Sequence, residues 1–464
     1  MSTRKYPPDS PVCGAVYDNA PANNPFLAAM PEILPREQFM DSIRSMPGLP
    51  YNLPQMSLEE RRQSLPLLSS LFFPMEFMYA VYEQLYRAIR ETYTTRTLID
   101  GIRQINALFC NQETVSYATQ AASGSILGVP GIGKTSTIRR TLATLPPVIE
   151  HTEYMGKPFF CKQVLYLRIE CPSDCSVKTL ALNLIAALDQ AIGSDYLHQL
   201  TSLRSIAASA IATQVKILCM THHVGLLLVD EIQNAVETAK KNRQTKPLLK
   251  FLVELTNDTS TAVYLIGTPM AEQLFTSQEH LKRRTRGIRL LPLKPDGTYR
   301  RFLEHLWSYQ FTPSAAPLSE QIANKLFDFS GGIPAYILKI FQESQAQALM
   351  QGQAQINEKI MQRAIDILAI KVPKTYSGGT YISDFEVQTS MEEPCLKQEN
   401  DSSDCIVPRL YANKRGRFAA DRDAKDLTAA YRNEADLLAY LQKMELLEVL
   451  PHSFFNSIDA RAVR

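Results

Sequence analysis

The sequence has no apolar run long enough to cross a bilayer, and the residues that follow Met1 are polar. We therefore expect neither a membrane anchor nor a secretory signal, and we expect a cytoplasmic protein. The eight cysteines lie far apart except for Cys171 and Cys175, a usage that suits a reducing compartment. No second pair of Cys or His follows at a matching spacing, so these two cysteines do not predict a metal site.

An excess of charge of one sign is also absent. The formal net charge is +2 over 464 residues, a balance that neither demands nor excludes nucleic acid as a partner. The basic residues gather instead in short clusters at 240–246, 281–289 and 414–417, and in the pair Arg61–Arg62. Each cluster is either a solvated surface or a nucleic-acid contact, and the sequence leaves both readings open.

The first part of the chain, residues 1–100, predicts an extension that makes contacts with a partner or within an oligomer. Residues 1–55 are rich in Pro and Asn and predict an extended arm with short helical pieces. Residues 75–92 predict an amphipathic helix, because their apolar residues follow helical spacing. These apolar residues are Met78, Val81, Tyr82, Leu85, Tyr86 and Ile89.

From residue 101 to residue 295 the pattern alternates between helices and strands. Such alternation predicts an α/β domain with a parallel sheet between helices. Residues 224–231 are nearly all apolar, as in a central parallel strand that is covered on both faces. Further strands are expected at 123–127, 163–170, 261–269 and 287–293, and helices at 134–145, 176–192 and 246–258.

After the α/β domain the sequence turns helical, and residues 296–372 predict a small helical lid. Residues 373–408 are polar and acidic, which predicts a flexible linker. Residues 409–464 carry a charged helix and no catalytic constellation, so we expect a helical docking segment.

The stretch "GVPGIGKT" fits the phosphate-loop pattern G-x-x-x-x-G-K-[ST]. Glycines let the backbone turn its N–H groups around phosphate oxygens, and the helix that follows adds its positive N-terminus. Lys134 is expected to reach the β and γ phosphates, and Thr135 to offer a hydroxyl to Mg²⁺. The expected nucleotide-binding residues are Gly128, Val129, Pro130, Gly131, Ile132, Gly133, Lys134, Thr135 and Ser136.

Two further strand ends add polar side chains. In "GLLLVDEIQN", Asp230 is placed to hold Mg²⁺ indirectly, and Glu231 to polarise the attacking water. In "LIGTP", Thr268 ends a third strand, where it would sense that water. Together with the phosphate loop, these residues predict a site for ATP or GTP.

This order of motifs over residues 101–372 resembles an AAA+ ATPase, with a P-loop NTPase core and a helical lid. The stretches "VDEIQN", "LIGTP" followed by "LKRR", and "LRIECPSDCSVKTLALNLIAALDQAIG" are similar to the TnsC/TniB branch, the ATPase regulators of DNA transposition. Residues 23–34 ("NNPFLAAMPEIL") and the long stretch 65–96 are similar to the segments before the TnsC core. They favour TnsC over the shorter TniB type.

The resemblance implies a bacterial, nucleoid-associated protein that assembles with ATP and Mg²⁺ as a ring or helical filament around duplex DNA. It implies a link between a target selector of the TnsD or TniQ type and the transposase subunits TnsA and TnsB, with hydrolysis resetting the assembly. Tail contacts with the transposase are part of the same expectation. Arg283 and Arg284 match the arginine region that acts on a neighbouring subunit's nucleotide, and Arg286 lies beside them.

In the family, DNA contacts come from the strand and helix after the first ATPase helix. Such contacts reach phosphates, so DNA binding is expected to be salt-sensitive and largely indifferent to sequence. The corresponding residues here are Lys157, Lys162, Ser176 and Lys178, together with Lys240, Lys241 and Arg243.

The sequence departs from many AAA+ lids at "SGGIPAYILK", where Gly332, Ile333, Pro334 and Ala335 are not accompanied by a sensor arginine. We therefore expect slow hydrolysis that times an assembly. Three alternatives stay open: an AAA+ protein of replication initiation or clamp loading, a scaffold that binds ATP without turnover, and a P-loop kinase for a small metabolite. The DE pair, the sensor strand and the separate lid disfavour the kinase, and Glu231 disfavours the inert scaffold.

Overall fold

The computed structural model describes residues 12–17, 24–95, 123–202, 206–236, 245–272, 274, 285–370 and 372. The chain divides into two units, Met1–Glu392 and Glu393–Arg464, and every described residue belongs to the first. The predicted linker and docking segment therefore lie outside the described residues. Within the described part of the chain, no helix is both long enough and apolar enough to cross a membrane.

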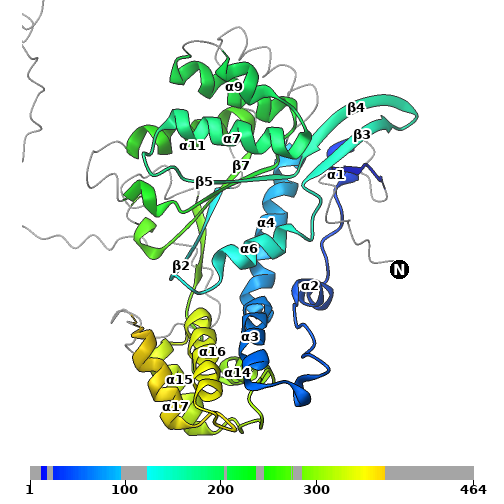
Figure 1. The fold of residues 1–464 in the computed structure, drawn as a ribbon. Coiled ribbons are helices and arrows are strands. Elements are labelled where there is room, and N and C mark those ends of the chain that lie inside the picture. The colour runs from blue at the N-terminus through cyan, green and yellow to red at the C-terminus, as the bar shows by residue number, and fades with distance from the viewer. Residues whose placement is uncertain are drawn as a thin grey trace, which may run out of the picture. The chain divides into compact units, whose positions relative to one another are not determined.

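A five-stranded parallel sheet forms the centre of the α/β domain, in the order β5-β6-β7-β2-β8. This arrangement confirms the predicted parallel sheet (Figure 1). Because the strands are parallel, their carboxyl ends share one edge of the sheet. The strands span Tyr166–Glu170 (β5), Leu226–Asp230 (β6), Ala262–Gly267 (β7), Ser123–Gly128 (β2) and Thr285–Leu290 (β8).

One face of the sheet is covered by α7 (Val177–Ile192), α9 (Ala208–Thr221) and α11 (Thr245–Thr259) (Figure 1). Leu227 and Val229 of β6 share a hydrophobic cluster with apolar residues of these three helices. Alternate residues of a strand point to opposite faces, so Leu226 and Leu228 of β6 must pack on the other face of the sheet.

The other face is covered by α4 (Glu76–Thr95) and α6 (Lys134–Leu142). Leu226 and Leu228 of β6 belong to the hydrophobic cluster that contains these two helices. All five residues of β6 are buried, which confirms the predicted strand covered on both faces.

Helix α4 confirms the predicted amphipathic helix, and its partner is the α/β domain itself. The hydroxyl of Thr92 donates to the carbonyl of Gly225 at 3.0 Å. The hydroxyl of Tyr93 donates to the carbonyls of Val164 at 3.0 Å and His223 at 2.9 Å. The division predicted at residue 100 thus separates elements that share one hydrophobic core.

The rest of the N-terminal segment consists of short elements that pack beside α4. Asn24 caps the first of these helices, because its side-chain oxygen accepts from the N–H groups of Phe26 and Leu27. Phe26 is buried and belongs to the same cluster as α4. The elements are β1 (Val12–Gly14), α1 (Pro25–Ala29), α2 (Arg36–Ile43), η1 (Leu53–Gln55), α3 (Leu58–Ser64) and η2 (Leu65–Ser70).

A second, three-stranded sheet was not predicted. The strands β3 (Val148–Tyr154) and β4 (Lys157–Val164) form an antiparallel hairpin that extends beyond the main sheet, and β1 pairs with β3 (Figure 1). The prediction of one strand over 163–170 is wrong in extent, because its first two residues belong to β4. Met155 and Gly156 both have positive φ at the turn, the geometry that favours a two-residue hairpin loop.

Four helices confirm the predicted helical region, and we call them the lid helices. Asp296, Ser319 and Asn357 cap three of them, each accepting N–H groups of the first helical turn. The lid helices are α14 (Gly297–Trp307), α15 (Glu320–Ser330), α16 (Pro334–Met350) and α17 (Glu358–Leu368).

Arg61, one residue of a basic pair in the sequence, is buried between α3 and the lid. Its guanidinium donates to the carbonyls of Phe311 at 2.9 Å, Thr312 at 3.2 Å and Met56 at 3.0 Å. A buried guanidinium with several carbonyl partners fixes the backbone segments that supply them. Arg61 is therefore structural, whereas Arg62 is exposed and pairs with Glu59.

Candidate functional site

The phosphate loop, residues 128–135, connects β2 to α6. Gly131 and Gly133 have φ values of 84° and 97°, a left-handed backbone conformation that residues other than glycine rarely adopt. Helix α6 begins at Lys134, directly after Gly133. The loop therefore places the N–H groups of the first turn of α6 at the carboxyl edge of the sheet, where they favour an anion.

The ammonium group of Lys134 folds over this loop. Its Nζ donates to the carbonyl of Gly128 at 2.7 Å and to that of Val129 at 3.2 Å. Burial lowers the pKa of Lys134, while the nearby carboxylates of Glu231 and Asp230 act in the opposite direction. The lysine thus lies where a phosphate oxygen would replace the carbonyls as its partner.

Asp230 ends β6 and faces the loop. Asp230 is 2% exposed, and its Oδ2 lies 3.4 Å from the hydroxyl of Thr135. Its Oδ1 accepts the backbone N–H of Glu231 at 2.9 Å. A carboxylate and a hydroxyl side by side are hard oxygen donors, the type that Mg²⁺ prefers, so the residues fit this metal.

Glu231, Gln233 and Thr268 form a second group at the same edge. Glu231 is exposed and has a φ of 57°. The Gln233 side chain donates from Nε2 to the Glu231 carboxylate and accepts the backbone N–H of Thr268 on Oε1 at 3.1 Å. Within the described residues, the buried hydroxyl of Thr268 has no hydrogen-bond partner. It is therefore open to a ligand or water. Sequence reasoning did not single out Gln233.

Arg168 of β5 is another polar residue of the site that the sequence did not reveal. Its Nη2 donates to the Oδ2 of Asp230 at 2.9 Å. The only available signal was one arginine between Leu167 and Ile169, two buried residues of an otherwise apolar strand.

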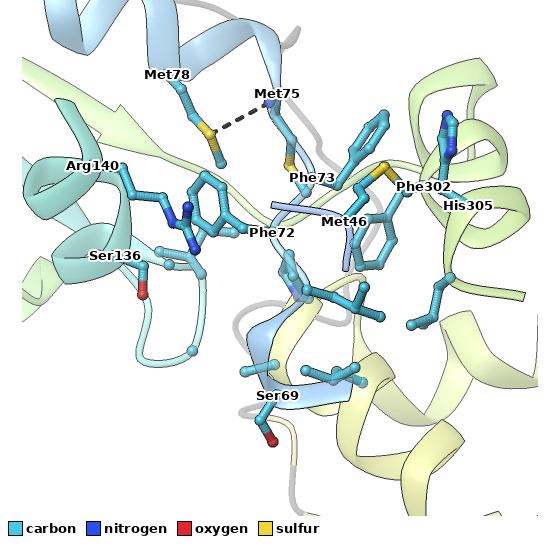
Figure 2. A pocket seen from close by; sticks show the side chains of 18 of the residues that line it. Met46, Ser69, Phe72, Phe73, Met75, Met78, Ser136, Arg140, Phe302 and His305 are labelled. Atoms are coloured by element: carbon cyan, nitrogen blue, oxygen red, sulfur yellow. Dashed lines mark hydrogen bonds between the residues drawn. The ribbon is translucent and has the colours of Figure 1, made fainter. Parts of the chain in front are cut away.

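A cavity of about 260 Å³ adjoins the phosphate loop (Figure 2). It is smaller than the roughly 300–1,000 Å³ of sites for drug-sized ligands, and it suits one part of a nucleotide. Its walls come from the N-terminal segment, the loop with α6, and the lid helices. They include Met46, Phe72, Phe73, Met75, Met78, Ile132, Arg140, Phe302, His305, Tyr309 and Leu338.

Arg140 of α6 places a charged group in the wall of this cavity. Its guanidinium lies 4.3 Å from the centre of the Phe72 ring, and Figure 2 shows the two side chains together. It also donates to the carbonyl of Ile43 at 3.0 Å. These contacts attach the N-terminal segment to the helix that begins at the phosphate loop.

The lid helices touch the phosphate loop directly. The N–H of Ala335 donates to the carbonyl of Gly131 at 3.2 Å. A Cβ at Gly131 would lie 3.0 Å from Ile333, so this glycine also permits the close approach of the lid. The start of α16, which has no sensor arginine, is therefore in contact with the loop itself.

The residues predicted to contact DNA fall on separate elements. Lys157 is exposed on β4, and Lys178 is exposed in the first turn of α7. Lys162 is half-buried and donates to the carbonyl of Ile192 at 2.8 Å. Ser176 caps α7 by accepting an N–H. Lys240, Lys241, Arg243, Arg283 and Arg284 lie outside the described residues, as does the side chain of Arg286.

Residues 118–275 match the family model described as "AAA domain". No curated protein matches the chain. The match and the parallel sheet between helices agree on an AAA+ P-loop fold.

Solved structures with a similar chain include Drosophila ORC bound to DNA, with 18% identity over 72% of this chain and 74% of that chain and a TM-score of 0.42. The Aeropyrum pernix ORC1 protein in complex with DNA has 12% identity over 58% and 64%, with a TM-score of 0.37. Cdc6p from Pyrobaculum aerophilum has 14% identity over 59% and 68%, with a TM-score of 0.34. The chain thus spans less than two thirds of the ORC1 protein. Likenesses this weak do not carry function to the chain, and its resemblance to TnsC stays a prediction.

Proposed function

We propose that this chain binds ATP with Mg²⁺ at the edge of the parallel sheet and hydrolyses it. The observation that carries the proposal is the meeting of Lys134, Thr135 and Asp230 at the carboxyl edge of the sheet, where the phosphate loop also borders an apolar cavity. Phosphates would lie on the loop, and the base would lie between Phe72 and the lid. An apolar cavity with aromatic walls suits a planar base.

The roles of the side chains follow from their chemistry. Lys134 would exchange its carbonyl partners for β and γ phosphate oxygens, and Glu231 would accept a proton from the attacking water. The open hydroxyl of Thr268 would orient that water. Thr135 would hold Mg²⁺ through its hydroxyl and Asp230 would hold it indirectly, and the metal when bound neutralises charge on the phosphates.

We further propose that the protein is a TnsC-type regulator of DNA transposition. The support is the combination of "VDEIQN", "LIGTP" and "NNPFLAAMPEIL" in one chain. In this role it assembles as a ring or filament on duplex DNA in a bacterial nucleoid. It links a target selector of the TnsD or TniQ type to the TnsA and TnsB transposase subunits, with the segment 409–464 docking on the transposase.

The geometry supports some of the proposed DNA contacts better than others. Lys157 and Lys178 are exposed and free to reach phosphates, whereas Lys162 already donates to Ile192. Arg283 or Arg284 would complete the ATP site of the neighbouring subunit. DNA binding through such contacts falls steeply as salt increases.

The test is electron-microscopic imaging of the full chain with ATP, Mg²⁺ and duplex DNA, together with a measurement of ATP turnover. We expect DNA-dependent filaments or rings and turnover well below tens per second. Glu231→Gln should keep the assemblies and lose hydrolysis, and Lys134→Ala should lose both. A monomer in the presence of both ligands, or assembly by Lys134→Ala, would refute the proposed role.

A further inference from the structure

Arg168 and Asp230 form an ion pair inside the candidate ATP site. The Nη2 and Oδ2 atoms are 2.9 Å apart, and the two side chains are 26% and 3% exposed. In the sheet register Arg168 is paired with Leu228, two residues before Asp230. Both side chains therefore project from the same face of the sheet, which is the face that carries α6 and Thr135.

Both oxygens of the Asp230 carboxylate already have a partner among the described residues. Oδ1 accepts the N–H of Glu231. Oδ2 accepts from Arg168 and also faces the Thr135 hydroxyl. The oxygen that stands beside Thr135, and so the one suited to Mg²⁺ or to a water that the metal carries, is thus the oxygen that accepts from Arg168.

A guanidinium and a divalent cation cannot share this oxygen at low cost. Like charges a few ångström apart repel strongly in a poorly hydrated site. The guanidinium of Arg168 also lacks one hydrogen bond in this position, because its Nε is buried without a partner in the described part of the chain. Its side chain reaches solvent, so it has room to leave Asp230.

We propose that Arg168 competes with Mg²⁺ for Asp230 and thereby sets the Mg²⁺ concentration at which the site loads nucleotide. The proposal rests on the proposed ATP site. Arg168 is a positioning residue in this scheme: it holds Asp230 in place before loading and is displaced when Mg²⁺ arrives. The site stays closed to the metal until the metal outcompetes the arginine.

The experiment titrates Mg²⁺ at a fixed concentration of a fluorescent ATP analogue and measures binding to the full chain. Arg168→Gln keeps a hydrogen-bond donor and removes the charge, so its half-saturating Mg²⁺ concentration should fall about five-fold or more. Arg168→Lys keeps the charge, so its half-saturating Mg²⁺ concentration should stay closer to that of wild type than that of Arg168→Gln does. Lys216→Met is the control, because Lys216 pairs with Asp258 at 2.8 Å in another partly buried ion pair, between α9 and α11. It should leave the titration unchanged.

A second readout does not depend on nucleotide. Mg²⁺ alone should raise the melting temperature of Arg168→Gln more than that of wild type, because only the variant leaves Asp230 uncompensated. A half-saturating Mg²⁺ concentration in Arg168→Gln equal to or above that of wild type would overturn the inference and leave the ATP site standing. Wild type that fails to bind the analogue at any Mg²⁺ concentration would overturn the ATP site itself.

Discussion

The backbone N–H of Thr268 donates to the Oε1 of Gln233 at 3.1 Å, which ties the end of β7 to the loop after β6. The Nε2 of the same Gln233 side chain donates to the carboxylate of Glu231. Gln233 therefore holds the residue proposed to activate water at a fixed distance from the residue proposed to orient it.

We predict that Gln233→Met lowers the rate of ATP hydrolysis by about 10- to 100-fold and changes ATP affinity by less than about three-fold. Methionine has a similar length and lacks both hydrogen bonds, so Glu231 would lose its fixed position while the phosphate loop stays intact. Single-turnover hydrolysis and equilibrium binding measure the two quantities. Gln362→Met on α17, where Gln362 pairs with Asp366, is the control. Equal losses of rate and affinity would contradict a positioning role.

Phe72 provides a test of the base cavity. Phe72→Ala should weaken ATP binding about ten-fold, because the base would lose an aromatic wall worth about 1–2 kcal/mol. Binding of inorganic triphosphate should stay unchanged, since the phosphate loop is untouched. Calorimetry with both ligands checks this. Tyr51→Ala, which alters an N-terminal side chain that is 97% exposed, should affect neither ligand. An equal loss of triphosphate binding would show that Phe72 does not act through the base.

Arg61 and Arg62 are adjacent in sequence and differ in burial, which makes them a matched pair. Arg61→Ala leaves the carbonyls of Phe311 and Thr312 without their donor. We expect the free energy of unfolding to fall by about 2–4 kcal/mol. Arg62→Ala removes an exposed pair with Glu59 and should cost about 0.5 kcal/mol or less. Urea denaturation compares the two, and equal effects would show that the contact with the lid is not stabilising.

We predict that the free energy of unfolding falls in mild acid because of His151. It is buried between Tyr17, at 2.7 Å, and Gln163, at 2.9 Å. Burial lowers the pKa of His151 below its ordinary 6.5, against the opposing hydrogen bond with Gln163. The unfolded chain thus binds the proton more tightly than the folded chain. The stabilisation that comes from the neutral, buried His151 is complete above pH 6.5 and is lost as the pH falls through the lowered pKa.

The expected slope is at most about 1.4 kcal/mol per pH unit for this one group. Chemical denaturation between pH 7.5 and pH 5 measures it. Burial lowers the pKa of His222 in the same direction, so the difference between wild type and His151→Gln isolates the His151 contribution. His198→Gln, at a position whose side chain is 79% exposed, should keep the wild-type slope.

The parts of the fold that follow from local pattern were predictable from the sequence. The run before Asp230 is apolar on both faces, and the glycine spacing before Lys134 fixes a loop between a strand and a helix. Helical periodicity predicted α4 and the lid helices. Each of these signals is complete within one short stretch of chain.

The rest depends on contacts between distant segments. The hairpin β3–β4 mixes charged and aromatic residues without clear alternation, and Gly156 at its turn was the one local signal. The base cavity joins walls from three parts of the chain, and Arg168 meets Asp230 only because β5 pairs with β6. The roles assigned to the residues of the nucleotide site and to the basic residues stay predictions.

The packing of α4 has a practical consequence for protein fragments. A fragment cut at the limits of the AAA match, 118–275, would lack α4 and the short elements beside it. Leu226, Leu228 and Tyr264 would then face water on one side of the sheet, and the cavity would lose its Phe72 wall. Such a fragment should aggregate on expression, whereas the chain from residue 24 to residue 372, which keeps α4, β8 and the lid helices, should stay in solution.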